Sequence, residues 1–247
     1  MEPSKIMIFI IASFEEPAYI DFIKMRKLQL QKYNIPHKFL YDGVNHDFFN
    51  DPLTDIFYEK EEPPPNIVHP HLNPHMIMKF MKALQSTDLS KYKYVLRINL
   101  STYINIPLLL TFLQSLPSEK TAAAYTMKHL LPDSSLELYK TTPIHLLSGC
   151  AQIFTMDFIR FLQTYDLTNH AILHMHSDDG VLSHLAKEYG CNFIHIPMIM
   201  QPTLAGSKLQ ELQDAILIRC KDEKSRMVDV AKWVYLLMVN DGINYDF

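Results

Sequence analysis

The sequence feature that most constrains the fold is an unbroken apolar run near the N-terminus, at residues 6–12. A strand with one face in water alternates apolar and polar residues, whereas this run has no polar position until Ser13. It is far shorter than the roughly 20 residues that cross a bilayer, and it lacks the basic flank and cleavage site of a signal peptide. The run therefore predicts a strand covered on both faces.

The remainder of the chain alternates between strand and helix patterns, which is typical of α/β proteins. Further apolar runs predict strands at residues 37–41, 94–98, 121–127, 150–155 and 192–196. Helical periodicity predicts helices that begin at Pro17 and that cover residues 76–85, 107–116, 156–164, 180–189 and 225–240. Because no repeat or linker divides this pattern, we expect a single domain over residues 1–247, with a mainly parallel central sheet and helices on both of its faces.

Residues 44–74 interrupt the alternation. They combine acidic residues with a proline run at 63–65 and a segment rich in histidine and proline at 69–75. Prolines lack the backbone N–H that helices and sheets need. This segment is therefore predicted to be a long excursion over the surface.

Composition narrows the class of protein further. The 247 residues are 48% hydrophobic and 20% charged, which excludes a disordered chain. The formal net charge of −4 gives no electrostatic reason to expect nucleic acid or an anionic membrane as a partner. Cysteines occur only at positions 150, 191 and 220, an odd and sparse set that suggests reduced thiols. We expect a cytoplasmic protein without a transmembrane segment.

Polar residues follow several of the predicted strands. In parallel α/β sheets, ligands bind at the carboxyl ends of the strands. The residues found at such ends here are Ala12, Ser13, Asp42, Arg97, Asn99 and Ser101. They can present side chains to a ligand, but Asn99 and Ser101 are also residue types that simply form turns. The pattern alone leaves both interpretations open.

A second group of polar residues surrounds a later strand and helix. Ser148 and Gly149 precede the strand at 150–155, and Asp178 and Asp179 precede the helix at 180–189. A helix N-terminus favours negative charge, which helps to keep a carboxylate ionised as a general base. The same position is also a common place for an aspartate that only caps a helix. One aspartate can cap while the other acts as the base.

Two further clusters carry charge or metal-binding groups. Arg219, Lys221 and Arg226 lie close together before the last helix, where they form either a diphosphate-binding group or an ordinary solvated surface. The spacing of His174, His176 and Asp178 partly matches the HxHxDH motif of metallo-β-lactamases, so a zinc hydrolase is an alternative. The final histidine of that motif is an aspartate in this chain.

Three segments together resemble a known family. Residues 91–105, KYKYVLRINLSTYIN, resemble the "YDYVLRTNLSSF" signature of small GT-A glycosyltransferases of bacteria and of large DNA viruses, including chloroviruses. They are also similar, more distantly, to "FLLKTDDDVFVN" of the β-1,3-galactosyltransferase and fringe families. Residues 147–157 resemble the "SGAGYVLSRD" segment, and residues 177–183 resemble the "EDV..G" segment. The resemblance covers most of residues 5–240 in order.

The resemblance implies a GT-A fold with a donor-binding half at about residues 1–105 and an acceptor and catalytic half at about 106–247. The implied donor is a nucleoside diphosphate sugar, with UDP as the expected nucleotide. Its contacts would be Ala12, Ser13, Asp42, Arg97, Asn99 and Ser101. Ser148 and Gly149 would border the acceptor, a hydroxyl of a glycan or glycoprotein. Asp179, or else Asp178, would be the base of an inverting reaction. A viral member of the family would act in the host cytoplasm.

The chain departs from the family at the metal-binding D-x-D motif. Asn99 and Ser101 stand where the family has carboxylates, and neutral ligands hold Mn²⁺ or Mg²⁺ weakly. Either the donor diphosphate holds the metal mainly by itself, or Arg219, Lys221 and Arg226 replace the metal. The loss of D-x-D is also compatible with an inactive module that only binds nucleotide sugars or glycans.

Overall fold

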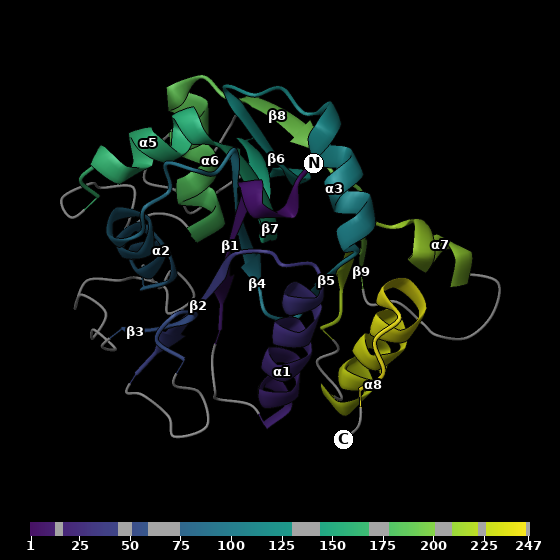
Figure 1. Ribbon diagram of the computed structural model, residues 1–247. Coiled ribbons are helices and arrows are strands. Elements are labelled where there is room, and N and C mark those ends of the chain that lie inside the picture. The colour runs from purple at the N-terminus through teal and green to yellow at the C-terminus, as the bar shows by residue number, and fades with distance from the viewer. Residues whose placement is uncertain are drawn as a thin grey trace.

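The computed structural model is an α/β structure in which a central sheet lies between two groups of helices (Figure 1). It describes residues 1–12, 17–43, 51–58, 75–129, 144–167, 178–200, 209–221 and 226–245. The apolar run near the N-terminus forms strand β1 (Ile6–Ile11), and all six of its residues are buried. The prediction of a strand covered on both faces is confirmed.

The central sheet has seven strands in the order β3-β2-β1-β4-β7-β6-β8. Besides β1, its strands are β2 (His37–Asp42), β3 (Asp55–Tyr58), β4 (Tyr94–Asn99), β6 (Thr121–His129), β7 (Ile144–Thr155) and β8 (Asn192–His195). All neighbours pair in parallel except β7, which is antiparallel to both β4 and β6. The sheet is therefore mainly parallel, as predicted.

The side of the sheet on which successive strands are added changes at β1. Strands β2 and β3 extend the sheet on one side of β1, and the chain then crosses back to place β4 on the other side. The carboxyl ends of β1 and β4 consequently form a topological switch point. In open α/β sheets, this is the position where ligands bind.

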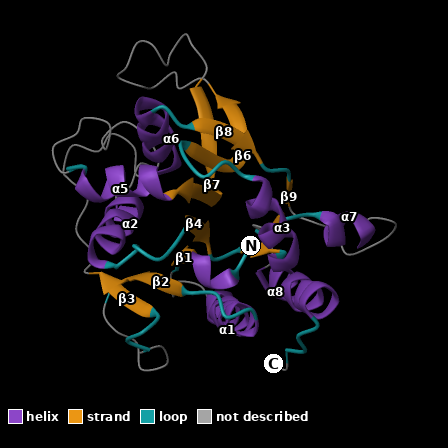
Figure 2. Ribbon diagram, turned by 45° about the horizontal axis from the view of Figure 1, so that its top comes forward, coloured by secondary structure: helices purple, strands orange, loops and turns teal. Residues whose placement is uncertain are grey.

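Helices cover both faces of the sheet (Figure 2). One face carries α1 (Pro17–Lys32), α3 (Ile106–Ser115) and α8 (Arg226–Leu236), and the other carries α2 (His75–Ser86), α5 (Met156–Thr164) and α6 (Asp178–Tyr189). A short 3₁₀ turn (Pro3–Lys5) precedes β1, and a π-helical turn (Leu237–Asp241) follows α8. Asn105 caps α3, because its side-chain oxygen accepts the N–H of Leu108.

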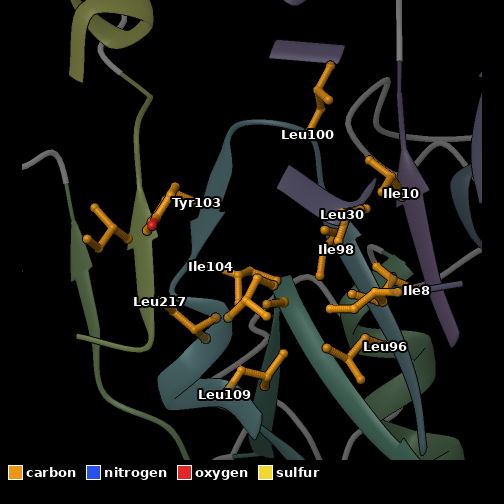
Figure 3. Close-up of a cluster of buried hydrophobic side chains, with 14 of the residues drawn as sticks. Ile8, Ile10, Leu30, Leu96, Ile98, Leu100, Tyr103, Ile104, Leu109 and Leu217 are labelled. Carbon is orange, nitrogen blue, oxygen red and sulfur yellow. The ribbon is translucent and has the colours of Figure 1, made fainter. Parts of the chain in front are cut away.

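Alternate residues of β1 enter two separate cores. Ile8 and Ile10 pack with α1 and α8 on one face, whereas Met7 and Phe9 pack with α2, α5 and α6 on the other. Figure 3 shows part of the first core, where Ile8 and Ile10 lie beside β4 residues and a cluster that includes Tyr103. The sheet is thereby fixed on both sides, which gives the ends of its strands a rigid base.

A second, smaller sheet lies beside the first, with the strand order β5-β10-β9. Its strands are β5 (Thr102–Ile104), β9 (Met198–Met200) and β10 (Leu217–Arg219). Strand β5 follows β4 after a two-residue turn, and β10 pairs with it antiparallel, so that Arg219 lies opposite Thr102. This sheet brings the C-terminal part of the chain to the end of β4.

The structure adds elements that the sequence did not predict. Strand β3 lies within the segment predicted to be an irregular excursion, so that prediction is wrong for residues 55–58. The short elements β5, β9, β10 and α7 (Leu209–Asp214) were also not expected. Among the described residues, no helix is long and apolar enough to cross a membrane.

Candidate functional site

Three of the predicted site residues lie at the ends of adjacent parallel strands. Ala12 follows β1, Asp42 ends β2 and Asn99 ends β4. The backbone N–H of Ala12 bonds to Leu40, and that of Leu100 bonds to Ile11. These bonds continue the pairing of the three strands beyond their formal ends. Ser13, predicted to accompany Ala12, lies outside the described residues.

Asp42 is held by a buried lysine. The ammonium group of Lys79 on α2 lies 2.8 Å from Asp42 Oδ2, and the Lys79 side chain is only 3% exposed. Asp42 itself is 38% exposed. The ion pair therefore fixes one carboxylate oxygen while the side chain still reaches solvent. Lys79 was not among the site residues predicted from the sequence, although a lysine is unusual among the apolar residues of α2.

The turn between β4 and β5 gathers polar groups. Asn99 Oδ1 is buried and has no hydrogen-bond partner among the described residues, and Ser101 is 5% exposed. The carbonyl of Ser101 accepts the N–H of Cys220 at 3.0 Å. Arg219 donates from Nη1 to the hydroxyl of Thr102 at 3.3 Å. The structure thus brings Arg219 beside Thr102, directly after the β4–β5 turn, although the two residues are more than a hundred positions apart in the sequence.

The other two cations of this cluster differ in their surroundings. Lys221 is half-buried and lies two residues after Arg219, at the same end of β10. Arg226 begins α8, where its Nη1 lies 3.6 Å from Asp229 Oδ2 and its guanidinium lies over the ring of Tyr19. Arg226 is therefore already paired with a buried carboxylate.

The residues at the D-x-D position do not fit a resident divalent metal. Mn²⁺ and Mg²⁺ prefer several oxygen ligands, with carboxylates among them. Asn99 and Ser101 offer one amide and one hydroxyl oxygen, and no group of three or more histidine, cysteine or acidic residues within the described ranges could hold a metal ion. His174 and His176, proposed for a zinc site, lie outside the described residues.

Arg97 occupies a different place from the one expected. It lies in β4, its side chain is 0% exposed, and its guanidinium points toward β7 and α6. Nη1 donates to the carbonyl of Gly149 at 3.1 Å and to Gln152 Oε1 at 3.3 Å, and Nη2 forms an ion pair with Asp178. The sequence placed Arg97 beside the donor, whereas the structure directs its guanidinium to protein groups.

The two aspartates belong to the first turn of α6. The sequence predicted that they precede the helix, but α6 begins at Asp178, so neither is the residue before the helix. Asp178 is ion-paired with Arg97. Asp179 accepts the N–H of Gly149 on Oδ2 at 3.1 Å, and Oδ1 accepts no hydrogen bond from any described residue. The two carboxylates therefore have different surroundings.

The start of α6 is attached to β7 through a second set of bonds. The hydroxyl of Ser183 accepts the N–H of Leu147 at 2.8 Å and donates to the carbonyl of Asp179 at 2.5 Å. Gln152 also donates to the carbonyl of Leu147 at 2.8 Å. Ser148, predicted to border an acceptor, is 5% exposed, and its hydroxyl lies 3.4 Å from the N–H of Cys150. Gln152 and Ser183 were not among the site residues predicted from the sequence.

A hollow elsewhere on the molecule lacks these features. An open depression of about 490 Å³ lies at the opposite, amino end of β2 and includes Pro36, His37, Leu53 and Tyr92. No carboxylate and no arginine are present among the described residues that line it. The candidate site is therefore the carboxyl edge of the sheet, at the end of β4.

Comparisons with known proteins agree with this architecture. No protein-family model matches the chain, and no curated protein sequence is significantly similar to it. Among solved structures, it is similar to a glycosyltransferase involved in the glycosylation of the major capsid of PBCV-1, with a TM-score of 0.51 and 10% sequence identity. That match covers 92% of this chain and 98% of the other.

Two other solved structures are less similar. The catalytic domain of Drosophila β1,4-galactosyltransferase 7 matches with a TM-score of 0.39 and 10% identity, over 77% of this chain and 64% of that one. A putative glucose-1-phosphate thymidylyltransferase from Bacillus anthracis matches with a TM-score of 0.44 and 7% identity, over 78% and 87%. The chain has a GT-A-like fold, and the expectation of that fold is confirmed.

Proposed function

We propose that the protein transfers a sugar from a nucleoside diphosphate sugar, with UDP as the nucleotide, to a hydroxyl group of a glycan. One observation carries the proposal: Arg219 and Asp179 approach the end of β4 from different elements, one from β10 and the other from α6. A cation is needed beside the departing diphosphate, and a carboxylate is needed beside the attacking hydroxyl. The switch point between β1 and β4 supplies the position for the donor.

The leaving group develops negative charge as the bond to the sugar breaks. Cations fixed beside it stabilise the transition state more than the ground state. Arg219 and Lys221 would lie along the diphosphate. The amide oxygen of Asn99, which has no partner among the described residues, and the hydroxyl of Ser101 would bind sugar or ribose hydroxyls. We assign no step to a divalent metal, because the residues at the D-x-D position do not fit one.

The acceptor hydroxyl needs a base. Asp178 is neutralised by Arg97, whereas Asp179 keeps one oxygen without a donor among the described residues. Asp179 would take the hydroxyl proton while the acceptor oxygen attacks the anomeric carbon and the diphosphate leaves. This single displacement inverts the anomeric centre. Ser148 and Gly149 would lie on the acceptor side of Asp179.

The nucleoside would lie at the ends of β1 and β2. Ala12 and Ser13 would contact the base and ribose from β1. Asp42, whose carboxylate is oriented by Lys79, would accept a hydrogen bond from the nucleoside. With these contacts, the sugar would lie between the β4–β5 turn and the start of α6.

A panel of nucleotide sugars tests this function. Each donor is added to the protein with EDTA or with Mn²⁺, and both the melting temperature and the release of free nucleotide are measured. A ligand that binds only the folded state raises the melting temperature. We expect one donor class to stabilise the protein and to be hydrolysed slowly, with rates in EDTA within about threefold of those in Mn²⁺. Stabilisation without turnover would indicate an inactive binding module, and no stabilisation by any donor would contradict the proposal.

A further inference from the structure

Arg97 is a charged residue at a position where burial is complete. Its neighbours in β4, such as Val95 and Ile98, are apolar and buried. Burial lowers the pKa of its guanidinium to about 10, an effect that the nearby Asp179 and Cys150 oppose. The group therefore stays positively charged at neutral pH. A buried cation is strongly unfavourable unless acceptors surround it, so its partners indicate what it does.

Its partners connect three elements. From β4, the guanidinium reaches the carbonyl of Gly149 and the side chain of Gln152 in β7, and it pairs with Asp178 at the start of α6. A guanidinium offers donors in a fixed planar fork, which sets the direction of each partner. The start of α6 is thereby fixed relative to the end of the sheet.

Gly149 makes this close arrangement possible. A Cβ atom at this position would lie 2.9 Å from Arg97 Nη1 and 3.4 Å from the carboxyl carbon of Asp179. The first distance is too short for any side chain to fit without movement of the guanidinium. The bare backbone of Gly149 accepts from Arg97 through its carbonyl and donates to Asp179 through its N–H. One residue thus joins the cation to the proposed base.

We propose that Arg97 is a positioning residue that holds the start of α6 through Asp178 and Gly149 and so directs Asp179 at the acceptor hydroxyl. This inference rests on the proposed function. Asp178 forms the ion pair with the buried guanidinium, and Asp179, which also lies near that charge, performs the proton transfer. The guanidinium touches neither the donor nor the acceptor.

Three variants test the proposal. Arg97→Met keeps an unbranched stem but removes the guanidinium with its charge and donors, and Arg97→Lys keeps the charge but removes the fork. Lys27→Met is the matched control, because Lys27 is also paired with a buried carboxylate, Asp55, at 2.9 Å, and this pair lies between α1 and β3. Melting temperature, donor Kd, kcat and hydrogen exchange of residues 178–183 are measured for each variant.

We expect Arg97→Met to lower kcat about 100-fold, within the range of a misplaced general base, while donor Kd changes less than about threefold. In Arg97→Met, hydrogen exchange at residues 178–183 should speed up relative to wild type by more than exchange elsewhere in the protein. The kcat of Arg97→Lys should be about tenfold higher than that of Arg97→Met. Lys27→Met should lower the melting temperature but leave kcat within about threefold.

Two results would overturn the proposal. A rise in donor Kd of more than tenfold with unchanged kcat would make Arg97 a donor ligand. The second result is that Arg97→Met and Lys27→Met lose equal amounts of kcat when they lose equal amounts of melting temperature. The role of Arg97 would then be purely structural. If Arg97→Met does not fold, Arg97→Lys decides the question through the same ratio of kcat to donor Kd.

Failure of the proposed function would be visible separately. If the wild-type protein transfers and hydrolyses no donor, the glycosyltransferase proposal fails. Hydrogen exchange still tests whether Arg97 holds the start of α6. Faster exchange at residues 178–183 in Arg97→Met, and not in Lys27→Met, supports that role. Unchanged exchange in Arg97→Met would overturn it.

Discussion

Two arginines, Arg26 and Arg97, are completely buried on opposite faces of the central sheet, and their partners differ. Arg26 lies in α1, on the face that α8 also covers, whereas Arg97 projects toward α6. Burial lowers the pKa of both, to about 9 for Arg26 and about 10 for Arg97. The two arginines are therefore equally buried but lie in different environments.

The hydrogen bonds and the ring contact of Arg26 are made with neutral groups, while the carboxylate of Asp241 lies near its charge. Arg26 donates to Gln29 Oε1 at 2.6 Å and to the carbonyl of Thr102, and its guanidinium carbon lies 4.4 Å from the centre of the Trp233 ring. Its nearest acidic network is one side chain away, because Gln29 in turn donates to Asp241 at 2.8 Å. Arg26 thus links α1 to β5 and to the C-terminal turn.

Arg97 instead pairs directly with an acid in the first turn of a helix. Asp178 forms the ion pair, and Asp179, which lies near the same charge, accepts no hydrogen bond on Oδ1 from any described residue. Complete burial of an arginine therefore does not by itself indicate function. The charge of the partner, and the place of that partner at the edge of the sheet, make the difference.

The largest effect is expected for Asp179, the proposed base. Asp179→Asn should lower kcat by about 10³-fold with nearly unchanged donor Kd, since the amide cannot accept the hydroxyl proton. The isosteric Asp178→Asn variant is the control, and it should retain more turnover while it loses stability. Kinetics and nucleotide titration of both variants check this. Near-normal turnover of Asp179→Asn would exclude this base assignment.

Replacement of Arg26 tests whether the two buried arginines differ in their roles. Arg26→Met should lower the free energy of unfolding by about 3 kcal/mol, because two buried acceptors lose their donor. The kcat of the folded protein should stay within about threefold of wild type. Denaturant unfolding and kinetics measure the two quantities. A loss of kcat as large as that expected for Arg97→Met would break the distinction between the two arginines.

A smaller effect is expected at the β10 end of the site. Arg219→Ala should raise donor Kd about tenfold, which corresponds to the loss of about 1.4 kcal/mol of binding free energy. Lys24→Ala, at an exposed position on α1, is the control and should leave donor Kd unchanged. Titration with UDP measures both. An unaltered Kd in Arg219→Ala would remove the cationic group from the proposal.

The smallest effect is expected for the pH dependence of stability due to Asp241, which lies near Arg26. Burial raises the pKa of Asp241 above its ordinary value of 3.8, so ionisation of this carboxyl disfavours the folded state. The stability that its protonated form contributes is present below pH 3.8 and is lost as the pH rises through the raised pKa. The stability advantage of wild type over Asp241→Asn should therefore shrink as the pH rises. Denaturant unfolding over a pH series measures it, and a constant difference would contradict the shift.

Much of the fold follows from local patterns. Apolar runs predict β1, β2 and β4, since a parallel strand buried on both faces tolerates few polar residues. Strand β3 has four residues at the edge of the sheet and only one of them is buried, so its pattern is weak. Strands β5 and β10 have three residues each, too few for a period to appear.

The site was only partly accessible from the sequence. The rule on carboxyl ends of strands points to Asp42 and Asn99, and the structure places both there. The direction of Arg97 depends on the pairing of β4 with β7 and on the docking of α6, and both are long-range contacts. For the same reason, no local pattern distinguishes Asp178 from Asp179.

A crystal structure of the protein with bound UDP would show whether the end of β4 binds the diphosphate of an activated sugar. We expect phosphate oxygens at about 3 Å from Arg219 or Lys221. Nucleotide bound elsewhere, such as in the hollow beside Pro36 and Tyr92, with the end of β4 unoccupied at saturating UDP, would contradict it.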